Sequence, residues 1–241
     1  MHATKRGVTL RPFETLVSEP NIADLRLLDG VLVIANSVSD TLLHLLYTHA
    51  VPTLLVAHRL PDLPIPRCVV DNIQGMESLA NHVLAECNRR MPIFLRGLFA
   101  QHDGRQRELA FRQVLANLRI NLPESHFLRG DFNPRLAVES LRAFLATGNI
   151  FDAVLSADYA MALAALGVLQ ESGLRVPEQV MLACFGDSPE VQAAGITAAA
   201  VYVPDLGKCA VENLLCLIEG TPIPAEITLP TVLHKRRSTC S

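Results

Sequence analysis

Two acidic residues stand where consecutive apolar runs end in the middle of the chain. Asp158 follows the run at 153–155, and Asp187 follows the run at 180–185. Residues 159–172, between the runs, carry apolar side chains at helical spacing, so the segment predicts a strand–helix–strand unit. Ligands of parallel sheets bind outside the carboxyl ends of the strands, where both carboxylates can accept hydrogen bonds from ligand hydroxyls. Asp158 is also expected to cap its own helix, and Asp187 has the alternative role of a turn residue.

Three further polar residues, Asn36, His58 and Asp71, stand at the ends of predicted strands nearer the N-terminus. We interpret His58 as a polar residue of a binding cleft, with a satisfied core histidine as the alternative. Asp71 either contacts a ligand or fixes the turn that follows it.

Signatures of catalysis are absent from the sequence. It contains no P-loop, no G-x-G-x-x-G, no H-E-x-x-H, no G-x-S-x-G and no carboxylate pair suited to acid–base chemistry. We therefore predict that the chain is not an enzyme, has no catalytic residues and needs neither a metal nor another cofactor.

Composition narrows the class of protein further. Half of the 241 residues are hydrophobic, the net charge is −3, and the only basic cluster is at 234–237, so no nucleic-acid-binding face is expected on this chain. Six cysteines without a C-x-x-C pair predict buried, reduced thiols. No apolar stretch is long enough to span a bilayer, and no signal peptide begins the chain, which predicts a soluble cytoplasmic protein without membrane contact.

Strand and helix patterns alternate along the whole chain. Apolar runs predict strands at 8–10, 30–35, 52–57, 68–70, 93–95, 127–128, 153–155, 180–185 and 232–233, and helical patterns occupy 40–50, 76–90, 104–118, 134–147, 159–172 and 205–220. Such alternation is typical of parallel sheets covered on both faces. There are too many strands for one sheet of this length, so we predict an α/β protein of two doubly wound, Rossmann-like lobes.

The order and spacing of several motifs resemble a known family, the ligand-binding cores of LacI/GalR-type transcriptional regulators, which share the periplasmic-binding-protein fold. The matching segments are 70–75 (family D-N-x-x-G), 107–111 (R-x-x-G-F), 130–132 (G-D-F), 157–158 with 173–177 (A-N-D … G-x-x-V-P) and 237–239 (R-x-S/T). The matches run nearly from end to end of the chain.

This resemblance implies two lobes joined by three crossovers, with a small-molecule effector bound in the cleft between them. By analogy, the N-terminal lobe comprises residues 1–90 and 204–222, and the C-terminal lobe comprises 91–203 and 223–241. The family cores dimerise, so we expect a homodimer. DNA would be contacted only through a helix-turn-helix domain, which this sequence does not contain.

The resemblance also assigns ligand-binding roles. Arg107 stands where the family has an arginine that hydrogen-bonds the ligand, and its fork of donors suits vicinal hydroxyls or a carboxylate. Phe132 stands where the family places an aromatic ring against the ligand. Two polar family residues are replaced, an asparagine by Ala157 and an aspartate by Gly186. These replacements depart from typical sugar recognition in the family, and Asp187 is the candidate to substitute for the aspartate.

The N-terminal end departs from the family pattern. The family core opens with a strand and a helix that this sequence lacks, and the loss would expose ladder hydrogen bonds in the first sheet. We expect a shortened chain, a wrongly assigned start, or a partner that fills the gap.

We predict an effector-binding sensor domain of a transcriptional regulator, which signals when the ligand closes the two lobes. One alternative is the sensory domain of a hybrid signalling protein such as a diguanylate cyclase. Another is a ligand-free dimerisation module.

Overall fold

The structure is a computed structural model that describes residues 28–34, 37–60 and 62–239. The chain forms two compact units, and each consists of segments distant in sequence. Unit 1 comprises residues 1–70 and 201–229, and unit 2 comprises residues 71–200 and 230–241. The chain therefore passes between the units three times, after residues 70, 200 and 229.

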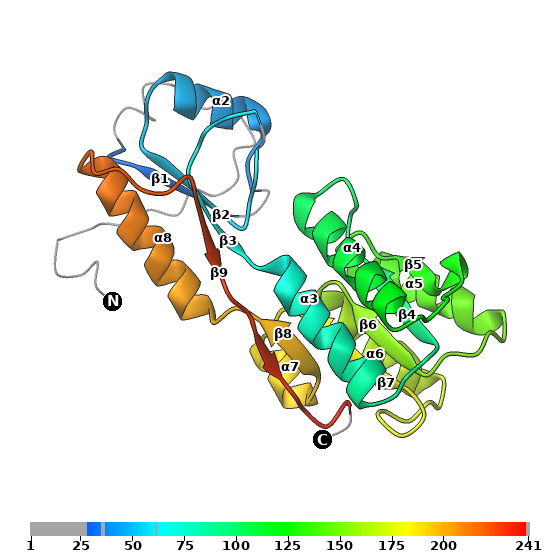
Figure 1. Cartoon of the computed structure of the whole chain (residues 1–241). Helices are drawn as coiled ribbons and strands as arrows, with labels where there is room; N and C mark the ends of the chain where they lie inside the picture. Colours follow the sequence, from blue (N-terminus) through cyan, green and yellow to red (C-terminus); the bar gives the residue numbers. More distant parts are fainter. Residues whose placement is uncertain (1–27, 35–36, 61, 240–241) are drawn as a thin grey trace. The chain divides into compact units, whose positions relative to one another are not determined.

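Unit 1 contains a four-stranded parallel sheet in the order β1-β2-β3-β9 (Figure 1). Two helices, α2 and α8, complete its described part. The bounds are β1 Val31–Ile34, α2 Asp40–Thr48, β2 Thr53–Val56, β3 Arg67–Val70, α8 Val203–Ile218 and β9 Glu226–Leu229.

Strand β2 is buried on both faces, which explains why it reads as a continuous apolar run. Leu55 packs with Leu43 and Leu46 of α2, whereas the next residue back, Leu54, packs with Cys68 and the α8 side chains. Successive side chains of a strand point to opposite faces, so each helix covers one face of the sheet.

Unit 2 contains a six-stranded sheet in the order β10-β8-β7-β6-β4-β5, parallel except for the antiparallel edge strand β10. The strands are β4 Pro92–Arg96, β5 Phe127–Arg129, β6 Ala153–Ser156, β7 Met181–Phe185, β8 Thr197–Ala200 and β10 Val232–His234. The helices are α3 Asn72–Asn81, α4 His102–Asn117, α5 Pro134–Ala146, α6 Tyr159–Glu171 and α7 Pro189–Ala194, with the π-helical turn η2 His82–Glu86 and the 3-10 turn η3 Glu124–His126.

Three phenylalanines anchor α4 on the sheet of unit 2. Phe94 stacks on Phe111 at 4.6 Å between ring centroids, and Phe127 meets both rings edge-on. Such geometries are favourable beyond the area that the rings bury. The alternating α/β fold predicted from the sequence is thus confirmed.

The units differ from the predicted lobes at residues 71–90, 201–203 and 223–229, and residues 201–203 belong to unit 1. Residues 71–90 belong to unit 2, because α3 packs against α4, β7 and β8 of that unit. Residues 223–229 belong to unit 1, because β9 pairs with β3. The strand predicted at 8–10 lies outside the described residues.

Two strands and one α-helix were not predicted. Strand β8 has the sequence TAAA, and alanine is uncommon in strands, yet all four residues are buried. Strand β9 lies at a sheet edge, where Glu226 forms ion pairs with Arg59 and Arg67. Helix α7 has only six residues, too few to show a helical period.

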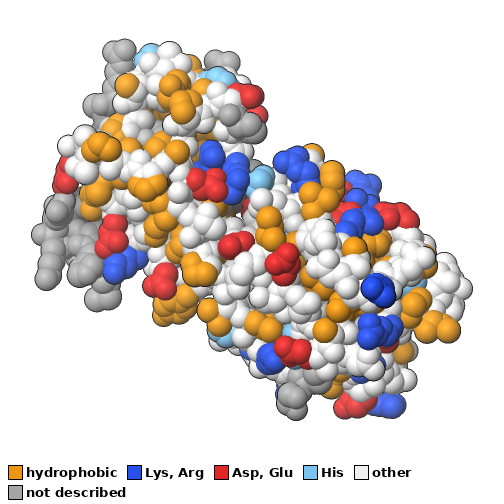
Figure 2. All heavy atoms as spheres, viewed as in Figure 1, with side chains coloured by type: hydrophobic (Ala, Val, Ile, Leu, Met, Phe, Trp, Pro, Cys, Tyr) orange, Lys and Arg blue, Asp and Glu red, His pale blue; other side chains and the backbone are white. Residues whose placement is uncertain are grey.

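Three predictions made from composition concern surface charge, membrane-spanning segments and the state of the cysteines. On the face that Figure 2 shows, basic and acidic side chains are interspersed. No helix in the described part of the chain is long and apolar enough to cross a membrane. Cys68, Cys184, Cys209 and Cys216 are free, as predicted, but Cys87 is disulfide-bonded, so the prediction of reduced thiols is wrong for this residue.

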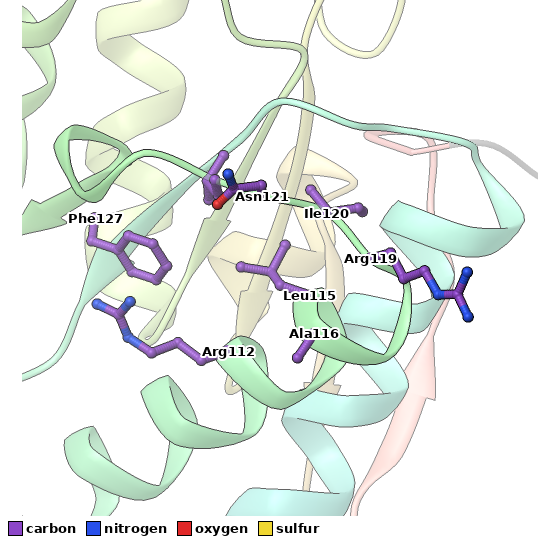
Figure 3. Close-up of a pocket in the computed structure, with 8 residues that line it drawn as sticks. Arg112, Leu115, Ala116, Arg119, Ile120, Asn121 and Phe127 are labelled. Atoms are coloured by element: carbon purple, nitrogen blue, oxygen red, sulfur yellow. The ribbon is translucent and has the colours of Figure 1, made fainter.

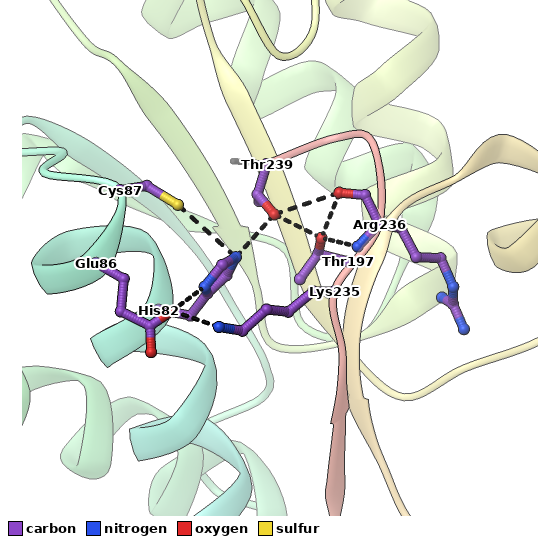
Figure 4. Close-up of polar contacts among 7 residues, drawn as sticks. All are labelled: His82, Glu86, Cys87, Thr197, Lys235, Arg236 and Thr239. Atoms are coloured by element: carbon purple, nitrogen blue, oxygen red, sulfur yellow. Dashed lines mark hydrogen bonds and ion pairs between the residues drawn. The ribbon is translucent and has the colours of Figure 1, made fainter. Parts of the chain in front are cut away.

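The segment after β10 is fixed to unit 2 by buried hydroxyl groups (Figure 4). The Ser238 hydroxyl donates to the Leu182 carbonyl at 2.5 Å and accepts from the Thr197 amide at 2.8 Å. The Thr239 hydroxyl lies 2.9 Å from His82 Nε2 and 2.7 Å from the Thr197 hydroxyl. The R-x-S/T segment, residues 237–239, therefore has a structural role, and we call it the C-terminal clasp.

His82, which is 1% exposed, extends this network to the surface. Its Nδ1 donates to the Glu86 carboxylate at 2.7 Å, and Lys235 donates to the same carboxylate at 2.5 Å. The hydrogen bond from His82, followed by that from Lys235, holds the pKa of Glu86 below its ordinary value.

We expect Thr239→Val to lower the free energy of unfolding by about 1–3 kcal/mol, because buried His82 Nε2 loses the hydroxyl group to which it is hydrogen-bonded. Urea denaturation measures the change. Thr221→Val, at an exposed position after α8, is the matched control and should have little effect. Equal stability of the two variants would contradict the clasp.

Candidate functional site

Arg107 lies in the first half of α4, and its side chain is 12% exposed. Its Nε donates to Asn72 Oδ1 at 2.8 Å, and its Nη1 donates to the Ala157 carbonyl at 2.8 Å. Asp103, one turn earlier on α4, lies 3.6 Å from Nη2. A guanidinium has five N–H donors, so donors beyond those used in these two hydrogen bonds can serve a ligand.

The D-N-x-x-G segment explains how Arg107 is held. Asp71 caps α3 by accepting a hydrogen bond from the Gln74 amide at 2.9 Å, so this residue fixes the turn, the alternative given for it. Asn72, which is buried, accepts from Arg107 and donates to Asp103 at 2.9 Å. Asn72, rather than Asp71, is therefore the residue of this motif that contacts the arginine.

The guanidinium of Arg107 lies 3.8 Å from the centroid of the Phe185 ring. Phe185 ends β7, and the position of Gly75 explains why its ring fits there. A Cβ on Gly75 would come within 2.6 Å of the Phe185 ring, so the glycine lets the ring pack against α3. Burial lowers the pKa of Arg107, and the charges of Asp103 and Asp158 oppose this effect without cancelling it. The cation–π contact with Phe185 helps to stabilise the guanidinium charge, which water solvates poorly at this position.

Phe132 lies near the same arginine: the distance from its ring centroid to the guanidinium carbon of Arg107 is 5.8 Å. Both Asp131 and Phe132 have positive φ, 51° and 59°, which is uncommon for residues other than glycine. A Cβ at Gly97 would come within 2.4 Å of the Phe132 ring, so this glycine makes room for it. Backbone strain of this kind concentrates at ligand-binding sites.

Asp158 caps α6, as predicted, by accepting hydrogen bonds from the amides of Ala160 and Met161 at 2.8 and 3.2 Å. Burial raises the pKa of Asp158, against the opposing effect of these amides and of Arg107. A carboxylate in this position is poorly solvated, which favours a polar ligand that donates hydrogen bonds to it.

Asp187 does not join the other predicted residues. Arg236 donates to both of its carboxylate oxygens, at 3.1 and 2.6 Å, and Gln192 donates at 3.2 Å. Burial raises the pKa of Asp187, but the hydrogen bonds and charge of Arg236 outweigh it, so the net shift is downward. The side chain that was expected to replace the family aspartate is occupied by an intramolecular ion pair.

The neighbouring Gly186 has a φ of 88°, a conformation that residues with a Cβ rarely adopt. A Cβ there would lie 3.0 Å from the Tyr159 ring, which is 38% exposed. The ring of Tyr159 therefore lies beside the position from which the family aspartate would project.

The remaining predicted residues lie elsewhere. His58 follows β2 in unit 1 and is 9% exposed. Asn36 lies outside the described residues. The structure thus brings together Arg107, Phe132 and Asp158, and adds Asn72 and Phe185. Phe185 was not predicted to be a site residue, because an apolar residue at the end of an apolar strand reads as part of the core.

A shallow pocket of about 420 Å³ lies at the end of α4, away from Arg107 (Figure 3). Arg112 lines it, with its guanidinium 3.6 Å from the Phe127 ring centroid. The guanidinium is already bound by Glu108 and Glu124, so little of its charge is left for a ligand. No group of three or more metal-ligating side chains occurs in the part of the chain that was described.

Residues 80–239 match the family of proteins described as having a periplasmic binding protein-like domain, and this is more than half of the chain. The chain belongs to this family. Curated relatives include the HTH-type transcriptional repressor MelR of Bacillus subtilis (strain 168), 27% identical over 223 residues that cover 88% of this chain and 64% of MelR.

Solved structures agree with this membership. A complex of the transcriptional regulator CelR with cellobiose is similar with a TM-score of 0.77 and 28% identity, covering 87% of this chain and 65% of that one. The regulator CcpA of Lactococcus lactis shares the fold, with a TM-score of 0.81 at 18% identity over 91% of this chain and 82% of that one.

The expected resemblance to LacI-type regulator cores is thus confirmed, and these relatives are transcriptional regulators rather than enzymes. The chain spans only about two thirds of the length of MelR and of the CelR chain. It corresponds to the part of such regulators that contains the periplasmic binding protein-like domain.

Because the folded-state pKa of Asp187 is lowered, its ion pair stabilises the protein above the ordinary pKa of about 3.9 and loses this effect as the pH falls through the folded-state value. We expect Asp187→Asn to be less stable than the wild type at pH 7 by about 1–3 kcal/mol, since Arg236 loses a charged partner.

The stability difference should shrink as the pH is lowered below 4, which urea denaturation at several pH values measures. Asp205→Asn, at an exposed position in α8, is the control and should show no such trend. A difference independent of pH would exclude the ion pair as its cause.

Proposed function

We propose that the chain is the effector-binding domain of a LacI-type transcriptional regulator and that its effector is a polar, sugar-like metabolite. The observation that carries the proposal is the guanidinium of Arg107, held on Phe185 with N–H donors to spare. Phe132 offers an aromatic face within 5.8 Å of that guanidinium. A planar guanidinium with several N–H donors, next to an aromatic ring, suits a molecule with vicinal hydroxyls and apolar C–H faces.

The comparison with CelR supports the ligand class. That regulator was solved with cellobiose, a disaccharide, and it is 28% identical to this chain. In this chain Gly186 lacks a side chain and Asp187 is bound to Arg236, so recognition would depend more on Arg107, Asp158 and the aromatic rings. We therefore infer a preference that differs in detail from that of CelR.

Signalling would follow from closure of the two units around the effector. A ligand shifts such an equilibrium only if it binds the closed form more tightly than the open form. In the complete regulator, we propose, closure alters the contacts of a cytoplasmic homodimer and the affinity of a helix-turn-helix domain for DNA.

One observation favours a second function, that of a dimerisation module without a ligand. Arg107 has protein partners on two sides, and Asp187 has its own ion pair, so polar groups that would bind an effector are partly used within the fold. A chain that binds none of a broad set of metabolites would support this alternative.

Isothermal calorimetry against mono- and disaccharides (including cellobiose), nucleobases and small carboxylates tests the proposal. For a ligand found in this way, we expect Arg107→Lys to weaken binding about 10- to 100-fold, because lysine keeps the charge but loses the planar fork. Arg105→Lys, exposed on the same helix, is the matched control and should bind as the wild type does. Unchanged affinity of the Arg107 variant would refute its assigned role.

Closure has a separate test. Small-angle X-ray scattering should show a smaller radius of gyration when the effector is saturating, because the units approach each other around it. The Arg107→Lys variant at the same ligand concentration should respond less, in proportion to its lost affinity. Tight binding without any change in the radius of gyration would rule out closure as the signal.

A further inference from the structure

Two cysteine sulfur atoms are in contact inside unit 1, far from the candidate effector site in the sequence. Cys68 lies in β3 and Cys209 lies in α8, and their Sγ atoms are 3.2 Å apart. Both are free thiols in this structure. A disulfide bond is about 2.0 Å long, so the two atoms need to approach by only about 1 Å to be bonded.

The two thiols differ in their surroundings. Cys68 is completely buried among Leu54, Val56 and Ala210, and burial, followed by the hydrogen bond to Cys209, raises its pKa to about 12. Cys209 is partly exposed, and the side-chain amide of Asn213 lies 3.6 Å from its sulfur. Cys209 is therefore the sulfur that a dissolved oxidant reaches, and Cys68 is the thiol held against it.

We propose that Cys68 and Cys209 form a reversible disulfide when the protein meets a peroxide, which makes unit 1 a site of oxidative modification. In the first step, the Cys209 thiol and hydrogen peroxide give a sulfenic acid and one water. In the second step, the Cys68 sulfur bonds to the Cys209 sulfur, and the displaced hydroxyl leaves with the Cys68 proton as a second water. The peroxide takes up the two electrons that the thiols lose.

The spacing favours a disulfide over a shared metal ion. Zinc–sulfur bonds of about 2.3 Å place two thiolates about 3.8 Å apart in a tetrahedral site, and about 4.6 Å apart in a linear one. The observed 3.2 Å is shorter than either. Within the described residues, no set of three possible ligands accompanies the pair.

The disulfide would join the two chain segments from which unit 1 is built. Cys68 lies just before the passage of the chain into unit 2 at residue 70, and Cys209 lies after its return at residue 201. A cross-link across so long a loop removes conformational freedom from the unfolded chain. The oxidised protein should therefore resist urea better than the reduced one.

Peptide mapping of the full chain tests the proposal. The protein is treated with hydrogen peroxide, its remaining thiols are blocked with N-ethylmaleimide, and the digest is analysed by mass spectrometry without reduction. We expect a linked peptide pair that contains Cys68 and Cys209, two hydrogens lighter than the reduced peptides, and its loss on treatment with dithiothreitol. Recovery of both cysteines as separately blocked peptides, while Cys216 has reacted, would overturn the proposal.

Variants separate this pair from the other thiols. Cys209→Ser should abolish the linked peptide and the rise in urea midpoint after oxidation, whereas Cys216→Ser, farther along α8, should keep both. If oxidation of wild-type protein links Cys209 to a different thiol, or converts it to a sulfinic acid, the assignment is wrong. The mapping of the wild-type protein decides the question even where a variant does not fold.

Discussion

The stacking of the Arg107 guanidinium on the Phe185 ring is the contact on which the candidate site depends. A cation that is only slightly exposed needs partners, because burial alone disfavours its charge. The aromatic face, the Asn72 amide oxygen and the Ala157 carbonyl supply them. One charged group therefore brings together a helix start and the carboxyl ends of two strands.

Two glycines, at positions 75 and 97, make room for the aromatic rings near Arg107. Gly75 leaves space for the Phe185 ring beside α3, and Gly97 leaves space for the Phe132 ring. Each glycine is needed because an aromatic ring near Arg107 occupies the position that its side chain would take. The C-terminal clasp also depends on buried groups, since the hydroxyls of Ser238 and Thr239 hydrogen-bond to the Leu182 carbonyl, the Thr197 amide and the His82 ring.

Much of the fold could be predicted from the sequence, because long apolar runs and helical periods report burial directly. The predicted helix at 159–172, for example, is α6 with its Asp158 cap. Strand β8 could not be predicted, because alanine has a low strand propensity and the packing of α3 against this strand leaves no local signal in the sequence. The two compact units divide after residue 70 and not near residue 90, since the packing of α3 on α4 is a tertiary contact without a local signal.

The sequence predicts the structural role of a residue where that role depends on the local backbone, and does not predict it where the role depends on a distant partner. Asp158 was expected to be a helix cap, which its position at a strand end implies. The loss of Asp187 to Arg236 could not be foreseen, because the two residues are far apart in the sequence and meet only through the antiparallel pairing of β10 with β8.

The central claim, that Arg107 is the anchor for a polar effector, is tested most directly by nuclear magnetic resonance of the arginine side chains. In protein labelled with ¹⁵N at arginine, the Arg107 Nε–H signal is identified by its absence from the Arg107→Lys variant. Saturation with a ligand identified by calorimetry should shift this signal and leave that of Arg105 unchanged. A ligand that binds while the Arg107 signal stays in place would contradict the account.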